Sequence, residues 1–180
     1  MVVRAQPRSA MPTIMIRPIE PRDADCLRVF HERLSPESRR MRFFSVHPHL
    51  SDDEVDRFVH VDGTRRVALI ALADGEIVGV ARYDQSLADL AEAEVAIVVR
   101  DDMQNHGIAG ALLDRLGARA GSKGIRRLTA VTLPENERVR QLFRWFRPGT
   151  SSRYGNGVVN VTMPLGTGPH HNARKESVLP

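Results

Sequence analysis

The chain has 180 residues, of which 42% are hydrophobic and 27% charged, and these values suit one globular domain with one buried core. No stretch approaches the roughly 18 consecutive apolar residues of a membrane span, and no secretory signal opens the chain, so we expect a soluble cytoplasmic protein without a membrane partner. The net charge of +4 comes mostly from dispersed arginines without a nucleic-acid motif, so we do not expect a nucleic-acid partner, whereas a ligand with several phosphates would exploit the same charge.

The folded part is predicted to be one domain over residues 13–165. The segments 1–12 and 166–180 are polar and lack an apolar pattern that a core could bury, so we expect both to be disordered.

The domain is predicted to begin with one strand followed by three helices. Ser35 before Pro36 is typical of a helix N-cap with proline at the first helical position. Ser51 and Glu54 form a capping box that opens another helix. Apolar periodicity supports the remaining boundaries. The elements in chain order are a strand over 13–17, a helix over 23–34, a helix over 36–43 and a helix that begins after 51.

The rest of the domain alternates strands and helices. Asp74-Gly75 is a hairpin signal between two strands of the sheet. The elements in chain order are strands over 66–73, 76–83 and 92–99, a helix over 107–121, a strand over 127–133, a helix over 136–146 and a strand over 158–163. This order predicts an α/β (α+β) domain whose mixed sheet is antiparallel at first and has a strand–helix–strand crossover near its end.

The strongest chemical signal is the run VVRDDMQNHGIAGALL, residues 98–113, in which a strand, a polar turn and a helix follow one another. The first amides of a helix lack internal partners and carry partial positive charge, so they bind a pyrophosphate. Gly107 permits close approach of the ligand, and Ala109 is small for the same reason. The alternative is a plain strand-to-helix turn that contains a glycine, and no Rossmann or Walker motif is present.

A second signal is a pair of carboxylates, Glu92 and Glu94, on one face of an otherwise apolar strand. Burying a carboxylate without a partner is costly, so each is either ion-paired or exposed, or has a function. For Glu92 we favour a structural position, either an ion pair or an exposed place at the sheet edge. Glu94 is a candidate general base, because only about one lysine in 2,500 is neutral at pH 7 and an acceptor amine must lose a proton.

At this point the sequence resembles the GNAT acetyltransferase superfamily. The family motif, Gln/Arg-x-x-Gly-x-Gly/Ala, is matched by Gln104, Gly107 and Ala109, and the segments IRPIEPRDAD, ADGEIVGVARY and LPENERVRQL follow the family order. More narrowly, the sequence is similar to the catalytic domain of bacterial Pat-type protein lysine acetyltransferases, through LSPESRRMRFF and AEVAIVVRDDMQNHGIAGALL. The resemblance does not extend to the regulatory domains of those proteins.

The resemblance implies a GNAT fold, with a mostly antiparallel sheet of six to seven strands, four to five helices, and fourth and fifth strands that splay apart. It implies transfer of the acetyl group of acetyl-CoA to a primary amine, preferably a protein lysine such as one on an acyl-CoA synthetase, with Glu94 as catalytic base. No metal is expected, and the protein is expected to be a monomer or a homodimer. The implied acetyl-CoA residues are Ile97, Val98, Val99, Gln104, Asn105, His106, Gly107, Ile108, Ala109, Gly110 and Asn136.

Several of these assignments have alternatives. Asn136 either binds the pantetheine arm or caps the following helix. Phe143 stands where many relatives have a tyrosine acid, and Arg147-Pro148 replaces a usual Gly-Phe. These departures keep open a non-catalytic acetyl-CoA sensor, beside an acetyltransferase of small-molecule amines and, in a further class, a nucleic-acid binder. Cys26, in the first helix, is too far along the chain from the motif to favour a thioester intermediate.

The helix over 136–146 carries two further open questions. Trp145 packs either in the core, which we favour, or against the cofactor. Arg138, Arg140 and Arg144 are expected to form a solvated face, or one of them meets the 3′-phosphate of the nucleotide.

Overall fold

The structure, a computed structural model, describes residues 12–166. The segments predicted to be disordered therefore lie outside the described residues, apart from Pro12 and Gly166. None of the helices within residues 12–166 has the length and apolar character needed to cross a membrane. The helices are α1 (Ala24–Glu32), α2 (Pro36–Phe43), α3 (Asp52–Val59), α4 (Ile108–Ser122) and α5 (Glu137–Phe146), with short 3-10 turns η1 (Pro21–Asp23) and η2 (Asp101–Met103).

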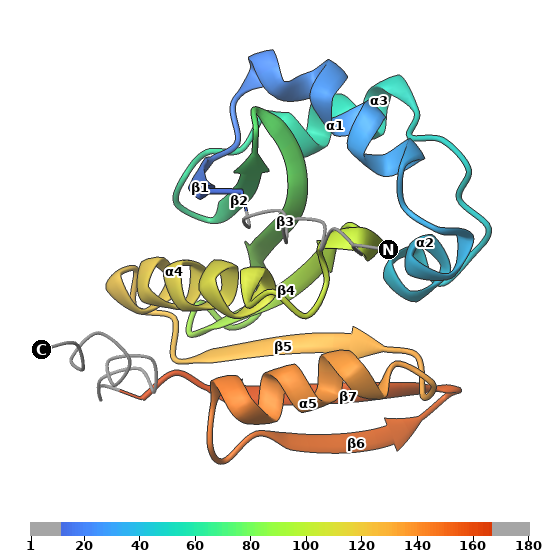
Figure 1. Cartoon of the computed structure of the whole chain (residues 1–180). Coiled ribbons are helices and arrows are strands. Elements are labelled where there is room, and N and C mark those ends of the chain that lie inside the picture. Colours follow the sequence, from blue (N-terminus) through green and yellow to red (C-terminus); the bar gives the residue numbers. More distant parts are fainter. Residues whose placement is uncertain (1–11, 167–180) are drawn as a thin grey trace, which may run out of the picture.

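Seven strands form one sheet in the order β1-β2-β3-β4-β5-β7-β6 (Figure 1). Every neighbouring pair is antiparallel except β4 and β5, which α4 joins by a crossover. The mixed, mostly antiparallel sheet predicted from the sequence is confirmed. The strands are β1 (Ile14–Pro18), β2 (Arg66–Ala73), β3 (Glu76–Gln85), β4 (Glu92–Val99), β5 (Arg127–Thr132), β6 (Ser151–Gly155) and β7 (Val158–Pro164).

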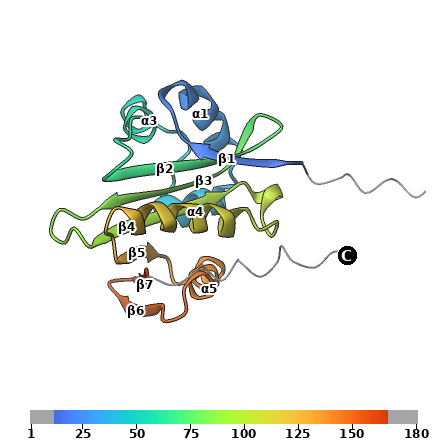
Figure 2. The same cartoon turned by 90° about the vertical axis from the view of Figure 1, so that its left-hand side faces the viewer.

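The sheet has a hydrophobic core on each face. On β2, Leu69 and Ala71 belong to the core under α4 and α5, whereas Ala68 and Ile70 belong to the core under α1 and α3. This division follows from the alternation of side chains along a strand, and it explains why β2 is apolar along its whole length. Figure 2 shows α1 and α3 beside β1 to β3, and α5 beside β5 and β7.

The predicted caps and turn are confirmed. The Ser35 hydroxyl accepts the Ser38 N–H at the start of α2, and Ser51 forms its capping box with Glu54 at the start of α3. Asp74 and Gly75 both have positive φ, as the tight hairpin between β2 and β3 requires.

The sequence did not predict β6. Four of its five residues are exposed, so Ser151–Gly155 shows no apolar alternation, and the strand is an edge strand that pairs only with β7. The available signal was the Asn156-Gly157 turn that follows, because both residues have positive φ and join β6 to β7 as a hairpin.

The predicted splay between β4 and β5 is also confirmed. The two strands pair only where Glu92–Glu94 meet Arg127–Thr129, and beyond Glu94 they separate. Within the described residues, Val95–Val99 therefore have a strand partner only on the β3 side. Figure 1 shows β5, β6, β7 and α5 lying together below the rest of the molecule, on the far side of this gap.

Candidate functional site

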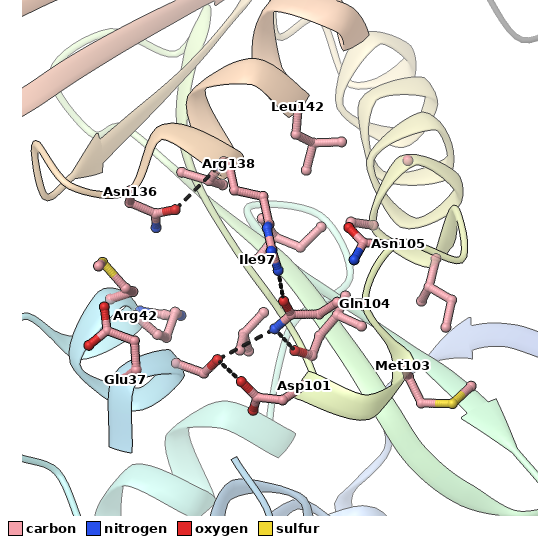
Figure 3. Close-up of a pocket in the computed structure, with 18 of the residues that line it drawn as sticks. Glu37, Arg42, Ile97, Asp101, Met103, Gln104, Asn105, Asn136, Arg138 and Leu142 are labelled. Atoms are coloured by element: carbon pink, nitrogen blue, oxygen red, sulfur yellow. Dashed lines mark hydrogen bonds between the residues drawn. The ribbon is translucent and has the colours of Figure 1, made fainter. Parts of the chain in front are cut away.

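A cavity of about 540 Å³ opens where β4 leaves β5 (Figure 3). It lies between the end of β4, the first turn of α4, the first turns of α5 and one side of α2. Its volume falls within the range of small-molecule and cofactor sites. The lining residues are Glu37, Ser38, Met41 and Arg42 of α2; Ile97, Val98 and Val99 of β4; Asp101, Met103, Gln104, Asn105, Gly107, Ile108, Ala109 and Gly110 around the start of α4; and Glu135, Asn136, Arg138, Val139 and Leu142 around the start of α5.

The start of α4 has the geometry of an anion site. Gly107 is the N-cap residue with φ of 76°, in the left-handed region that glycine adopts without strain. The first helical hydrogen bond runs from the Ala111 N–H to the Gly107 carbonyl over 3.0 Å, so the amides of Ile108, Ala109 and Gly110 precede the ladder. These amides and the positive end of the helix dipole meet the cavity together.

The cavity brings together most of the predicted cofactor residues from three separate segments of the chain. His106 is exposed and lies outside the cavity lining, although its neighbours Asn105 and Gly107 belong to it. The assignment of all the predicted cofactor residues to acetyl-CoA stays a prediction.

Gln104 joins the two sides of the cavity. Its side-chain amide donates to the Val99 carbonyl over 3.1 Å and to the Ser38 hydroxyl over 3.4 Å, and its carbonyl accepts from Arg138 (Figure 3). Asp101 adds to this network by accepting from the backbone N–H of Ser35 and from the hydroxyls of Ser35 and Ser38. A chain of hydrogen bonds therefore links α2, the loop before α4 and α5.

The Asp101 carboxylate is held in its charged form. Burial would raise the pKa of Asp101, but the hydrogen bonds from Ser35 and Ser38 outweigh burial and lower it. The start of α2 is thereby fixed against the loop that leads into α4.

Asn136 is the N-cap of α5, so the helix-capping role, one of its two predicted roles, is confirmed. Its Oδ1 accepts the Val139 N–H over 3.2 Å (Figure 3). The same residue lines the cavity, and its Nδ2 donates no hydrogen bond within residues 12–166. Capping the helix and binding a ligand are therefore compatible roles for the two ends of this amide.

Glu94 is exposed and lies just outside the cavity lining. Its partner across the sheet is Asp84 of β3. Both carboxylates act on Arg42: burial and the nearby Arg82 guanidinium lower the pKa of Arg42 to about 10, while Glu94 and Asp84 oppose that shift. Arg42 lines the main cavity as well as a smaller one of about 40 Å³ under α1 and α3, so it lies between the two cavities.

The other carboxylate of this strand, Glu92, is ion-paired, which is one of the two structural alternatives expected for it. Glu92 lies 3.5 Å from the Arg127 guanidinium of β5, at the point where β4 and β5 still pair. The two glutamates on one face of β4 therefore have different surroundings, since Glu92 is ion-paired and Glu94 is exposed.

Two aromatic residues of α5 have different positions. Phe143 is 1% exposed in the core under α4 and α5. Its ring has no acidic proton, so it cannot act as the general acid. Trp145 is 48% exposed, so the core position favoured from the sequence is wrong. Its ring lies on the first turn of α4, where an ideal Cβ built on Gly110 would be 3.1 Å from the Trp145 Cζ3 atom.

The sequence did not single out Glu37 and Ser38, two cavity residues of α2. They reach the cavity because Asp101 anchors α2 to a loop more than sixty residues further along the chain. Such a contact leaves no local pattern. Within residues 12–166, no three His, Cys, Asp or Glu side chains are grouped so that they could hold a metal ion, and Cys26 is exposed on α1.

Comparison with known families and curated proteins gives two findings. The model of the acetyltransferase (GNAT) family matches residues 30–146, from α1 to the end of α5. The chain is similar to the acetyltransferase PA5475 of Pseudomonas aeruginosa, with 31% identity over 133 residues that make up 72% of this chain and 71% of the relative.

Comparison with solved structures agrees. The crystal structure of the GNAT domain of S. lividans PAT is 38% identical, with a TM-score of 0.78 over 83% of this chain and 89% of that chain. A putative acetyltransferase of Salmonella typhimurium, yncA, solved with its cofactor acetyl-CoA, is 15% identical with a TM-score of 0.67, over 86% of this chain and 95% of that chain. The latter similarity shows the fold alone.

Proposed function

The chain belongs to the acetyltransferase (GNAT) family and uses acetyl-CoA, and we propose that it transfers the acetyl group to a primary amine, that of a protein lysine. The observation that carries the proposal is the cavity at the splay, where the bare amides of α4 meet the unpaired edge of β4. An anion site beside an open strand edge suits a ligand with a diphosphate at one end and an amide-containing arm at the other.

The residues of the cavity fit acetyl-CoA along its length. The amides of Ile108, Ala109 and Gly110 bind the diphosphate. Gly107 has no side chain that could obstruct it, and nothing lies within 4 Å of the position its Cβ would take, so this space is open to the ligand. The open edge of β4 at Val95–Val99 binds the pantetheine amides as a neighbouring strand would. The free Nδ2 of Asn136 donates to the same arm from the other side of the gap.

Glu94 acts as the general base. Glu94 lies outside the cavity lining, so its carboxylate takes the amine proton through an intervening water rather than directly. Val98, on the same strand face, orients the acceptor between the base and the acetyl group. Arg42 offsets part of the negative charge of Glu94 and Asp84, because it interacts with both.

The acceptor enters past α2. Glu37 of α2 and Glu135 before α5 line the cavity, and their exposed carboxylates share the Arg40 guanidinium, which lies 3.5 Å from each. Exposed carboxylates at an entrance attract an ammonium group. A lysine side chain also has a long apolar stem that suits the apolar wall formed by Met41 and Val98.

The similarity to the GNAT domain of S. lividans PAT and the Pat-type segments of the sequence support a protein lysine as acceptor. By the same resemblance, an acyl-CoA synthetase is the protein on which we expect this lysine, and we place the reaction in the cytoplasm, carried out by a monomer or a homodimer.

The experiment is a free-thiol release assay on the full chain with acetyl-CoA. The acceptors are folded proteins that carry reactive lysines, including an acyl-CoA synthetase, and a panel of free small amines. Acetyl-CoA-dependent thiol release with a protein, together with mass-spectrometric acetylation of a lysine, supports the proposal. Release with small amines alone shows a small-molecule acetyltransferase. Tight acetyl-CoA binding without release for any acceptor shows a non-catalytic binder.

A further inference from the structure

One face of α5 borders the cavity and carries a cation and an indole. Arg138, Leu142 and Trp145 occupy positions i, i+4 and i+7, so they form one stripe on the helix. Arg138 and Leu142 line the cavity. Trp145 contacts Gly110, which lines the cavity from α4, so the stripe follows the cavity from its inner end to its rim.

Trp145 lies at this rim with its ring supported. The ring packs on Gly110, where a Cβ would require the ring to shift, and about half of the side chain stays exposed. A large aromatic residue that is held in place and still open to solvent offers a flat surface on which a planar ring can stack.

The arginines of α5 differ in their partners. Arg140 and Arg144 both pair with Glu137, and Arg140 also donates to the carbonyls of Leu133 and Pro134. Arg138 contacts only the neutral side chain of Gln104 and pairs with no carboxylate within residues 12–166. It is therefore the arginine of this helix whose charge is available to an anion in the cavity.

We propose that α5 binds the nucleotide end of coenzyme A, with Arg138 on one of its phosphates and Trp145 stacked on its adenine. The inference rests on the proposed function, since it takes the diphosphate to lie at the start of α4 and the pantetheine arm to run inward along β4. The adenosine must then leave outward past Gly110, where Trp145 lies. Arg138 and Trp145 are seven residues apart, about 10 Å along the helix axis, and both side chains are long enough to reach the phosphate and the adenine of one nucleotide.

Binding would replace one contact of Arg138 by a stronger one. The hydrogen bond to the neutral Gln104 gives way to a charge-assisted bond to a phosphate. Gln104 keeps its bonds to Val99 and Ser38, so the loop before α4 stays in place while Arg138 moves.

The test uses the fluorescence of Trp145, which is the single tryptophan of the chain. We expect coenzyme A and dephospho-coenzyme A to change this fluorescence saturably. Phosphopantetheine, which lacks adenine, should bind in calorimetry and leave the fluorescence unchanged. Trp145→Ala should weaken coenzyme A binding by about tenfold to a hundredfold, the usual value of a lost base–aromatic stack, and should leave phosphopantetheine binding unchanged. Trp145→Phe keeps a stacking ring and should bind coenzyme A nearly as the parent does.

Arg138→Gln should weaken coenzyme A binding about tenfold, and Arg144→Gln is the matched control that should not. If the loss vanishes for dephospho-coenzyme A, Arg138 binds the 3′-phosphate; if the loss is equal for both ligands, it binds the diphosphate.

The inference is overturned if coenzyme A binds in calorimetry without changing the fluorescence, and if Trp145→Ala and Arg138→Gln bind it as tightly as the parent. That result would leave the proposed function standing. Absence of coenzyme A binding to the folded parent chain would instead contradict the proposed function itself.

Discussion

The two parts of the sheet are joined in different ways. On the N-terminal side, β3 and β4 pair continuously from Gly79 opposite Val99 to Gln85 opposite Ala93. On the C-terminal side, β4 and β5 share only the short stretch at Glu92–Glu94 before they separate. The cavity lies in the gap that this difference leaves.

The two sides of the gap are also stabilised by different kinds of contact. The start of the N-terminal part is fixed by charge, since Arg17 donates two hydrogen bonds of 2.7 and 2.6 Å to the buried Asp23 carboxylate. The C-terminal part is fixed to α4 by close packing, because an ideal Cβ on Gly117 would lie 2.8 Å from the Phe146 ring. Both contacts lie away from the gap, so we expect stability and function to respond to different substitutions.

The largest effect is expected on turnover. Glu94→Gln should lower kcat by about 10²- to 10⁴-fold, because an amide cannot take the acceptor proton. The Kd for acetyl-CoA should change by less than about twofold, since the base acts on the amine. Glu92→Gln, on the same strand face but paired with Arg127, is the matched control and should keep most of the activity. Steady-state kinetics and calorimetry check this, and equal loss in both variants would contradict the role of Glu94.

The next effect is expected on cofactor binding. Gly107→Val places a β-branched residue at a φ of 76°, and Gly124→Val does the same at 82°, with open space around both positions. Both should lose about 1–2 kcal/mol of unfolding free energy. Only Gly107→Val should weaken acetyl-CoA binding, by about tenfold to a hundredfold, because it disturbs the amides of α4. Equal binding by the two variants would place the phosphates elsewhere.

A third substitution should affect stability alone. Asp23→Asn leaves Arg17 without its carboxylate and should cost about 2 kcal/mol of unfolding free energy. Asp25→Asn, exposed on α1, is the control, and acetyl-CoA binding should be unchanged in both. Urea unfolding measures the difference in unfolding free energy. A loss of acetyl-CoA binding without a loss of stability would contradict the purely stabilising role of Asp23.

The Asp23 contribution should depend on pH. The hydrogen bonds from Arg17 hold the pKa of Asp23 below its usual value. A lowered pKa in the folded state stabilises the fold above the unfolded value of about 3.9 and ceases to do so as the pH falls through the folded value. The stability difference between the parent and Asp23→Asn should therefore be full at neutral pH and shrink below about pH 4. A constant difference over that range would show that the charge of Asp23 is not its cause.

The smallest effect is expected at the sheet edge. Tyr154 of β6 is 70% exposed and far along the sheet from β4, so Tyr154→Ser should change the unfolding free energy by less than about 0.5 kcal/mol. Acetyl-CoA affinity and turnover should be unchanged. A variant that folds normally but loses turnover would show that the functional surface extends to β6.

Local contacts explain which parts of the fold were predictable. The caps of α2 and α3 and the Asp74-Gly75 turn depend on residues within three or four positions, so their patterns are visible in the sequence. β6 was missed because an exposed edge strand needs no apolar alternation, and its register is set by β7 and the Asn156-Gly157 turn.

The site was predictable in its motif and not in its surroundings. The loop over 104–110 is one continuous segment, and the structure places most of it at the cavity. The contributions of α2 and the stripe on α5 depend on tertiary contacts, such as those of Asp101 with Ser35 and of Trp145 with Gly110. Trp145 was misplaced because apolar periodicity describes a helix face and does not show which neighbour covers it.

Amide hydrogen exchange of the full chain with and without acetyl-CoA tests the central claim most directly. The account predicts slower exchange at the start of α4, over 104–111, and along the open edge of β4 at 95–99, with β1 and β2 unchanged. Protection confined to α1 and α3, with the amides of 104–111 exchanging as before, would contradict it.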